Sequence, residues 1–213
     1  MRGEVFSDRA EAGRLLASAL VSYRSSDAIV LAIPRGGVPV GHALAKALHL
    51  PLDVLLCKKI GHPRNPEFAV GAVSMEGVHV DDRFQLPADW VSGEVERLRQ
   101  QMRDRIRRYR GQRPVPALEG RTVILVDDGV ATGHTLLASI ALLRAARPGR
   151  LVVAMPVVPA AFVPTGRAAA DEFVFLLAPE EFEAVGQFYA DFSPVEDDEV
   201  VRLLNDAWST TRA

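Results

Sequence analysis

The sequence predicts an α/β fold built on a doubly wound, mostly parallel and twisted sheet. Short apolar runs alternate along the chain with stretches of helical spacing, which is the pattern of a sheet assembled from βαβ units. Two of these runs end in glycine-bearing turns, at residues 34–37 and 127–133. In open α/β sheets such turns, at the carboxyl ends of the strands, hold ligands. The 213 residues contain no repeat and no low-complexity linker, so we expect a single domain over residues 1–213.

The composition argues against several classes of protein. Hydrophobic residues make up 48% and charged residues 24% of the chain, and a formal net charge of −2 gives no general attraction to nucleic acid or acidic membranes. The single cysteine, Cys57, excludes an intrachain disulfide framework and predicts a buried structural thiol at the end of an apolar run. No segment approaches about 18 uninterrupted apolar residues, and residues 1–6 lack the apolar part of a signal peptide. We therefore expect a cytoplasmic protein without a membrane segment.

The first quarter of the chain predicts the first two strands of the sheet and their helices. Helical apolar spacing and buried apolar runs identify them. The expected elements are a helix at 11–23, a strand at 28–33, a turn at 34–37, a helix at 38–48 and a strand at 52–57.

An insertion of different character occupies residues 58–115. Residues 58–67 are rich in charge, glycine and proline and predict a long mobile loop. One or two short strands, in the form of a hairpin, are expected within residues 68–80, and a helix with seven arginines at 94–110. Acidic residues interrupt the arginines and the chain is slightly acidic overall, so this helix predicts a solvated or subunit-contact face rather than a surface for RNA or DNA.

The second half of the chain completes the sheet. Its strongest strand prediction is residues 122–126, which run directly into two aspartates. The elements expected after it are a helix at 135–146, a strand at 151–157, a helix at 162–170, a strand at 173–177 and a last helix at 198–208. The segment from residue 179 onward carries clustered aromatic residues.

The residues after the strand at 122–126 predict the ligand. Asp127 and Asp128 leave the strand together at its carboxyl end, and residues 131–135 then open a helix. Backbone N–H groups at a helix amino terminus, with the hydroxyls of Thr132 and Thr135 beside them, form a phosphate cradle. Carboxylates would repel a ligand that is only a phosphate. They suit one that has a phosphate at one end and a vicinal diol or a magnesium ion a few ångströms away, such as a ribose 5-phosphate unit.

The segment from Val123 to Thr135 resembles the signature of the type I phosphoribosyltransferases. The resemblance implies that Asp127 and Asp128 bind the 2′- and 3′-hydroxyls of the ribose. It also implies that the 5′-phosphate is wrapped by Ala131, Thr132, Gly133, His134 and Thr135. Gly129 departs from the family, which usually has an aliphatic residue there. The plain alternative is a strand whose aspartates only cap the following helix, and neither a P-loop nor a G-x-G-x-x-G motif is present.

A second anion site is predicted at residues 34–37, on the same edge of the sheet. Arg35 and the N–H groups around Gly36 and Gly37 can converge on a phosphate, and the turn resembles the family's pyrophosphate loop. The two glycines permit a positive φ, and the resemblance implies a cis peptide between Pro34 and Arg35. The alternative is an ordinary strand–helix turn.

Lys58 and Lys59 look like the lysine pair at the start of the family's flexible catalytic loop. The resemblance implies that a lysine meets the pyrophosphate and that the following loop closes as a lid, with His62, Arg64 and Glu67 as further candidates for a catalytic role. A solvated charge pair is the alternative for the lysines.

The aromatic tail is similar to the part of the purine enzymes that contacts the base. The resemblance gives Phe182, Val185 and Phe188 as candidate base-binding residues of a small C-terminal hood over residues 179–213, with hydrophobic packing of the tail as the alternative.

Together these features predict a phosphoribosyltransferase. The expected reaction is Mg²⁺-dependent transfer of the 5-phosphoribosyl group from phosphoribosyl pyrophosphate to a nitrogen acceptor, with release of pyrophosphate. A nucleobase is the favoured acceptor, and a non-nucleobase acceptor is the alternative. Mg²⁺ would arrive with the donor, with Asp127 and Asp128 as the nearest protein groups, and the family resemblance implies a homodimer that acts in nucleotide metabolism. Ala131 stands where enzymes for 6-oxopurines often have an aspartate, which disfavours hypoxanthine and guanine. The alternatives are a regulator that senses phosphoribosyl pyrophosphate without turnover and, less favoured, a phosphatase or kinase with Asp127 as nucleophile.

Overall fold

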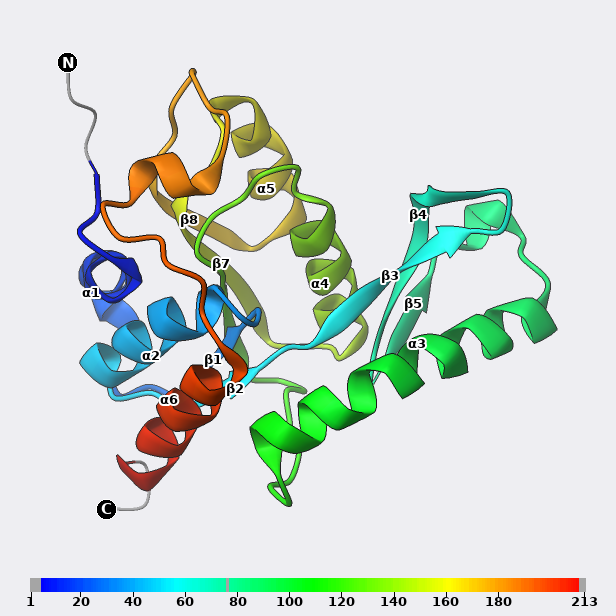
Figure 1. The fold of residues 1–213 in the computed structure, drawn as a ribbon, viewed down its shortest axis with the longest axis horizontal. Helices are drawn as coiled ribbons and strands as arrows, with labels where there is room; N and C mark the ends of the chain where they lie inside the picture. The colour runs from blue at the N-terminus through cyan, green and yellow to red at the C-terminus, as the bar shows by residue number, and fades with distance from the viewer. Residues whose placement is uncertain (1–4, 76, 211–213) are drawn as a thin grey trace.

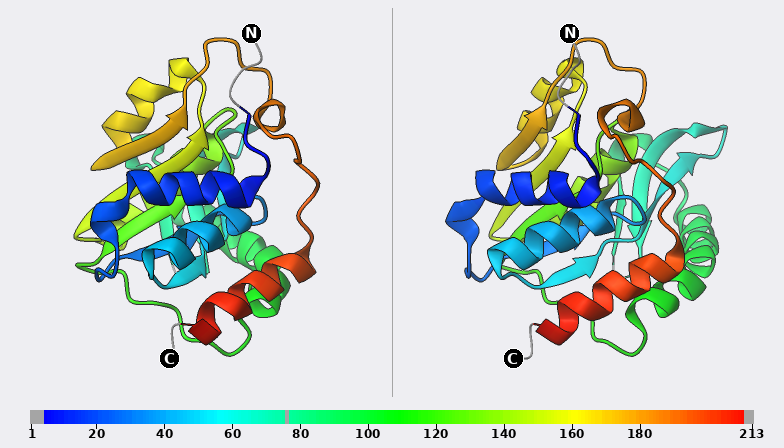
Figure 2. Two further views of the ribbon diagram at one scale, coloured as in Figure 1. Left: turned by 90° about the vertical axis from the view of Figure 1, so that its left-hand side faces the viewer. Right: turned by 60° about the vertical axis from the view of Figure 1, so that its left-hand side comes forward.

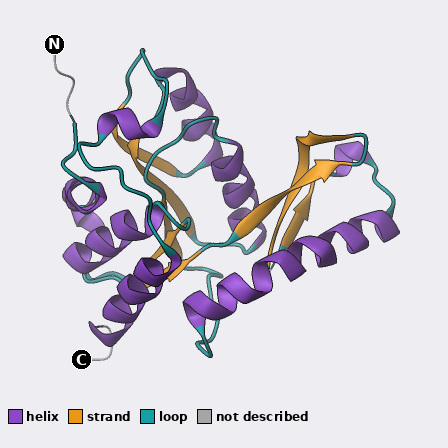
Figure 3. Ribbon diagram, viewed as in Figure 1, coloured by secondary structure: helices purple, strands orange, loops and turns teal. Residues whose placement is uncertain are grey.

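The computed structural model describes residues 5–75 and 77–210 and contains the parallel sheet that the sequence predicts. Its five strands lie in the order β2-β1-β6-β7-β8, and all neighbouring pairs are parallel (Figures 1 and 3). The strands are β1 (Ile29–Ala32), β2 (Leu52–Val54), β6 (Thr122–Val126), β7 (Arg150–Val157) and β8 (Glu172–Leu177). The predicted α/β class is therefore confirmed.

Alternating side chains of the strands feed two separate cores. In β1, Val30 and Ala32 belong to the core on one face, whereas Ile29 and Leu31 belong to the core on the other. The first face is covered by α1 (Arg9–Ala19), α2 (Gly37–Leu48) and α6 (Asp197–Thr210), and the second by α4 (His134–Ala145) and α5 (Val163–Ala169) (Figure 2). Burial on both faces explains why these strands read as continuous apolar runs.

The residues expected to be a mobile loop form part of a second, antiparallel sheet, so the loop prediction for residues 58–67 is wrong. The sheet has the order β3-β4-β5 and stands apart from the parallel sheet (Figure 1). Its strands are β3 (Cys57–His62), β4 (Asn65–Ser74) and β5 (Val78–Val80). Strand β3 shows little apolar signal because only Ile60 of its six residues is fully buried, and a register shift follows at Gly61.

Helix α3 (Ala88–Arg110) packs on the second sheet. Val95, Leu98 and Met102 from one face of the helix share a small core with Ile60 and Val73. The helix starts six residues before the predicted residue 94. The parallel strand expected at 52–57 likewise ends earlier, at Val54.

Short 3₁₀ helices complete the chain. They are η1 (Val21–Tyr23), η2 (Asp82–Phe84), η3 (Ala160–Phe162) and η4 (Val185–Phe188). In the described part of the chain, no helix has the length and apolar character needed to cross a membrane.

Candidate functional site

Two loops meet at the carboxyl edge of the parallel sheet because β1 and β6 are neighbours in register. Ile29 pairs with Val123 and Ala32 with Val126, so the turn at 34–37 and the aspartates after β6 emerge side by side. A hydrogen bond from the Ile33 amide to the Val126 carbonyl, 2.9 Å long, extends the pairing to the edge itself. The structure therefore brings together the two predicted anion sites.

The glycines of the first loop are required by contact with the second. A Cβ on Gly36 would lie 2.0 Å from a carboxylate oxygen of Asp128, and one on Gly37 would lie 2.8 Å from the Cα of Asp127. Gly36 has φ −59°, so the positive φ that the sequence suggested is not what these glycines supply. The Pro34–Arg35 peptide is cis, as expected.

The Arg35 side chain points along this edge toward the start of α6. Its Nη1 atom lies 3.6 Å from a Glu196 carboxylate oxygen and 3.9 Å from one of Asp197, and the side chain is 41% exposed. Arg35 is thus accessible at the edge, although its partners in the structure are acidic side chains.

Asp127 and Asp128 lie close together in a partly buried place. The Asp128 amide donates to Asp127 Oδ1 at 2.9 Å. Burial, followed by the negative charge of Asp128, raises the pKa of Asp127 well above its ordinary value. Burial also raises the pKa of Asp128, and the nearby Arg9 opposes that shift. Two carboxyls kept together against their mutual repulsion are typical of a functional site rather than of a helix cap.

Residues 131–135 curve into the amino terminus of α4. Gly133 adopts φ 78°, a left-handed conformation that favours glycine, and a Cβ there would lie 2.1 Å from the Phe162 ring. Helix α4 begins at His134, and its first turn has no acidic residue. The first amides of a helix have no partner within it and carry partial positive charge, so this turn can hold a phosphate.

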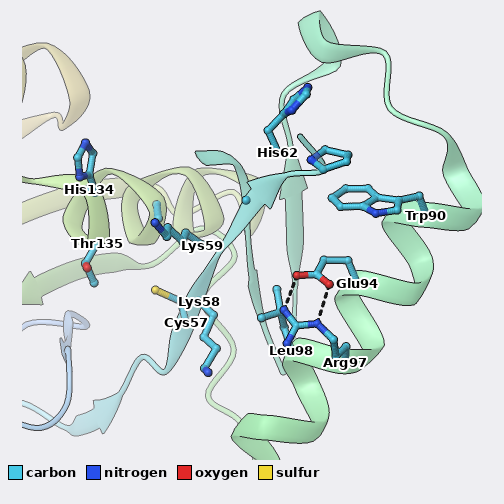
Figure 4. A pocket seen from close by; sticks show the side chains of 13 residues that line it. Cys57, Lys58, Lys59, His62, Trp90, Glu94, Arg97, Leu98, His134 and Thr135 are labelled. Atoms are coloured by element: carbon cyan, nitrogen blue, oxygen red, sulfur yellow. Dashed lines mark hydrogen bonds and ion pairs between the residues drawn. The ribbon is translucent and has the colours of Figure 1, made fainter. Parts of the chain in front are cut away.

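The two lysines approach this edge from β3 rather than from the end of a parallel strand, which corrects the sequence prediction. Lys59 extends toward His134 and Thr135, whereas Lys58 points the other way (Figure 4). Lys58 Nζ donates to Gln101 Oε1 of α3 at 2.7 Å. Both lysines line a cavity of about 700 Å³ together with Cys57, His62, His134 and Thr135.

Other candidates from the expected lid have different positions. The Arg64 amide donates to His62 Nδ1, and the His62 ring makes an edge contact with Phe84 at 6.4 Å between centroids. The side chain of Glu67 lies outside the described residues.

Cys57 is partly buried, its sulfur lies 3.1 Å from Ser139 Oγ, and burial raises the pKa of its thiol.

The C-terminal segment from residue 179 packs against the loop that follows β6. Phe182 and Phe188 stack on each other with ring centroids 5.6 Å apart, and both belong to a small apolar cluster with Val185. Val185 also takes the space that a side chain at residue 129 would need, since a Cβ on Gly129 would lie 2.7 Å from its Cγ1. The three side chains therefore pack together in the tail, and Val185 also meets the loop that carries the aspartates, while a role in base binding stays a prediction.

Two residues at the site were not found from the sequence. Arg9 Nε donates to Asp128 Oδ2 at 2.9 Å, and the Tyr189 hydroxyl donates to the Asp128 carbonyl at 2.6 Å. Arg9 follows a helix cap and Tyr189 lies in an aromatic cluster, so neither carries a motif that would identify it.

A parallel sheet with paired carboxylates and a helix amino terminus at one edge defines an α/β protein with a candidate site for a phosphorylated ligand. The phosphoribosyl transferase domain family matches residues 6–192, and the chain belongs to this family.

Individual relatives agree with the family assignment. A Mycobacterium tuberculosis protein named "Putative phosphoribosyl transferase" is 40% identical over 209 residues, which cover 96% of this chain and 47% of that protein. This chain thus spans about half the length of that relative. The protein TT1426 from Thermus thermophilus, known from a crystal structure, is 41% identical in sequence to this chain. The match covers 95% of this chain and 98% of TT1426, with a TM-score of 0.87. The AQ2163 protein from Aquifex aeolicus, at 11% identity and a TM-score of 0.50 over 84% of this chain and 78% of its own, shares the fold.

Proposed function

We propose that the protein transfers a 5-phosphoribosyl group from phosphoribosyl pyrophosphate to a nitrogen acceptor and releases pyrophosphate. The observation that carries the proposal is the meeting of three parts at one edge: the two carboxylates, the open amino terminus of α4 and the turn at 34–37. A ligand that spans them has a diol in the middle and a phosphate at each end.

In this arrangement each part has a separate task. Asp127 and Asp128 accept hydrogen bonds from the ribose hydroxyls, and the first turn of α4 holds the 5′-phosphate. Negative charge develops on the leaving pyrophosphate, where Arg35 and Lys59 would supply positive charge at this edge. Fixed positive groups placed where charge develops lower the barrier for the displacement.

The residues present fit a magnesium ion that is carried by the donor. Among the described residues, no group of three or more histidine, cysteine, aspartate or glutamate side chains could hold a metal ion. Asp127 and Asp128 offer carboxylates, and the donor adds diol and pyrophosphate oxygens, which are the ligands that Mg²⁺ prefers. When bound, the ion would offset the repulsion between the pyrophosphate and the two aspartates.

The acceptor in this proposal is a nucleobase other than a 6-oxopurine. Ala131 is exposed at the loop and offers no proton acceptor. Of the three candidate base-binding residues, Val185 packs against Gly129, which directly follows the two aspartates, and Phe182 and Phe188 stack on each other beside it.

Calorimetry with phosphoribosyl pyrophosphate and Mg²⁺ tests the donor site. Asp128→Asn keeps the shape of the side chain but loses a charge-assisted hydrogen bond, so donor binding should weaken by about 1.5–3 kcal/mol. Asp27→Asn is the matched control, because Asp27 is exposed and lies beside the opposite, amino end of β1. Unchanged affinity in both Asp127→Asn and Asp128→Asn would refute the proposal.

Turnover is tested by pyrophosphate release in the presence of a panel of bases. Release that depends on one base identifies the acceptor. Tight donor binding without release under any base would instead support the sensor alternative.

A further inference from the structure

Arg9 is the first residue of α1, and it lies next to Asp128 although the two are 119 positions apart in the chain. Its Nε atom donates to Asp128 Oδ2 at 2.9 Å, and the two side chains are only 11% and 15% exposed. An ion pair so far out of water requires good geometry to be retained.

Further contacts hold the Arg9 guanidinium in this place. Its Nη1 atom donates to the Ser193 carbonyl at 2.9 Å, and its Cζ lies 3.8 Å from the centroid of the Phe192 ring. Helix α1 is itself fixed at this end, since the Asp8 carboxylate accepts from the Glu11 amide at 2.7 Å. The guanidinium is therefore clamped between the C-terminal segment and the loop of the aspartates.

The same C-terminal segment also holds the backbone of Asp128. The Tyr189 hydroxyl donates to the Asp128 carbonyl at 2.6 Å. The Tyr189 ring packs against the Phe192 ring, with the two ring centroids 5.1 Å apart. The side chain of Asp128 is therefore bonded to Arg9, and its backbone carbonyl is bonded to Tyr189.

The charges around Asp128 make Arg9 its main counter-ion. Asp127 faces it from the same loop with a like charge, Tyr189 faces it from the tail as a neutral donor, and the turn at 34–37 presents Gly36. Arg35 in that turn is paired with Glu196 and Asp197. Burial raises the pKa of Asp128, and Arg9 works against that rise.

We propose that Arg9 is a positioning residue for the donor site, which fixes the orientation of Asp128 and links it to the C-terminal segment. This proposal rests on the proposed function. A carboxylate has lone pairs for several donors, so Arg9 can hold Oδ2 while a ribose hydroxyl binds the remaining acceptor sites. Arg9 acts through Asp128 and has no contact with the reacting atoms.

The variants Arg9→Met and Arg9→Lys test this, with Arg14→Met as control. Arg14 lies further along α1 and is exposed. Calorimetry with phosphoribosyl pyrophosphate and Mg²⁺ should show at least a tenfold loss of affinity for Arg9→Met, a smaller loss for Arg9→Lys and no change for Arg14→Met. Ribose 5-phosphate should lose affinity in parallel, whereas inorganic pyrophosphate with Mg²⁺ should not. A merely structural role would weaken both probes alike.

A second measurement does not depend on donor binding. In the protein without ligand, the ¹H–¹⁵N amide signals of Asp128 and Gly129 should shift or broaden in Arg9→Met at constant pH and stay at their wild-type positions in Arg14→Met. Unchanged signals, or donor affinity that stays equal or increases in Arg9→Met, would overturn the role of Arg9. If the wild type fails to bind phosphoribosyl pyrophosphate while the signals move as expected, the proposed function fails and the positioning of Asp128 by Arg9 stands.

Discussion

The missing side chain of Gly36 allows the two ligand loops to touch. Its Cα faces the Asp128 carboxylate so closely that a methyl group would fall 2.0 Å from Oδ2 and 2.6 Å from Cγ. This contact is unrelated to the φ angle, which is that of a right-handed helix. The turn pattern indicates Gly36 for a different reason, the freedom to adopt a positive φ, because a turn pattern cannot show which atoms a distant loop will bring near.

We expect Gly36→Ala to displace the Asp128 carboxylate and to lower donor affinity at least tenfold while the protein still folds. Gly93→Ala is the control, since Gly93 is helical and no atom lies within 4 Å of a Cβ there. That control should leave binding unchanged and stabilise the protein by up to about 1 kcal/mol. Calorimetry and thermal unfolding measure the two effects, and wild-type affinity in Gly36→Ala would contradict the contact.

The charge of Asp127 should lower the stability of the fold although it favours donor binding. Its folded-state pKa is raised, first by burial and then by Asp128, so its charged form is disfavoured in the folded protein. The resulting loss of folding free energy is absent at pH values below the pKa of an aspartate in the unfolded chain, about 3.9. It grows as the pH rises from there through the pKa of Asp127 in the folded protein. Asp127→Asn removes the charge and keeps the oxygen that accepts from the Asp128 amide.

We therefore expect Asp127→Asn to raise the Tm at pH 8, by about 2–4 °C for each kcal/mol relieved, while donor binding weakens. The gain should be smaller at pH 5. Thermal unfolding at both pH values measures it, and a lower Tm for the variant at pH 8 would show that the charge stabilises the fold.

At the scale of elements, the strand β3 is where sequence and structure differ most. The parallel strands β6 and β7 are predictable because burial on both faces gives unbroken apolar runs. Strand β3 forms through backbone hydrogen bonds with β4. These bonds give no apolar pattern in the sequence of β3, which contains two lysines, a glycine and a histidine. Lys58 and Lys59 line the cavity that His134 and Thr135 also line, but the strand that carries the two lysines was not predicted.

Because side chains alternate along β3, the two lysines should differ in function. Lys59 extends toward the amino terminus of α4, whereas Lys58 is bonded to Gln101 (Figure 4). We expect Lys59→Met to lower kcat by about 10²-fold, as the loss of one charge-stabilising group does. Lys58→Met should cost less than about tenfold. Steady-state kinetics with the identified acceptor measures both, and equal effects would mean that β3 turns or moves during the reaction.

For the whole molecule, the site is a meeting of segments from almost the full length of the chain. Arg9 comes from the start, Gly36 and Asp128 come from the carboxyl ends of β1 and β6, and Tyr189 comes from the tail. Local motifs identify the loops at β1 and β6, since a phosphate cradle and its carboxylates are contiguous in sequence. Arg9 and Tyr189 depend on packing between distant segments, which no local pattern encodes.

A ligand that binds such a site must stabilise the whole fold, because the site exists only when these segments are together. At a free donor concentration of 100 times Kd the gain is about 2.7 kcal/mol, which corresponds to a rise in Tm of about 5–10 °C for a chain of this size. We expect this rise with phosphoribosyl pyrophosphate and Mg²⁺ together. It should fall to a small fraction in excess chelator, because the pyrophosphate then faces Asp127 and Asp128 without a cation between them. Asp128→Asn should lose most of the rise, and Asp27→Asn should keep it. A full shift in chelator would show that the two carboxylates do not face the pyrophosphate, and the donor would then have to bind elsewhere on the edge of the sheet.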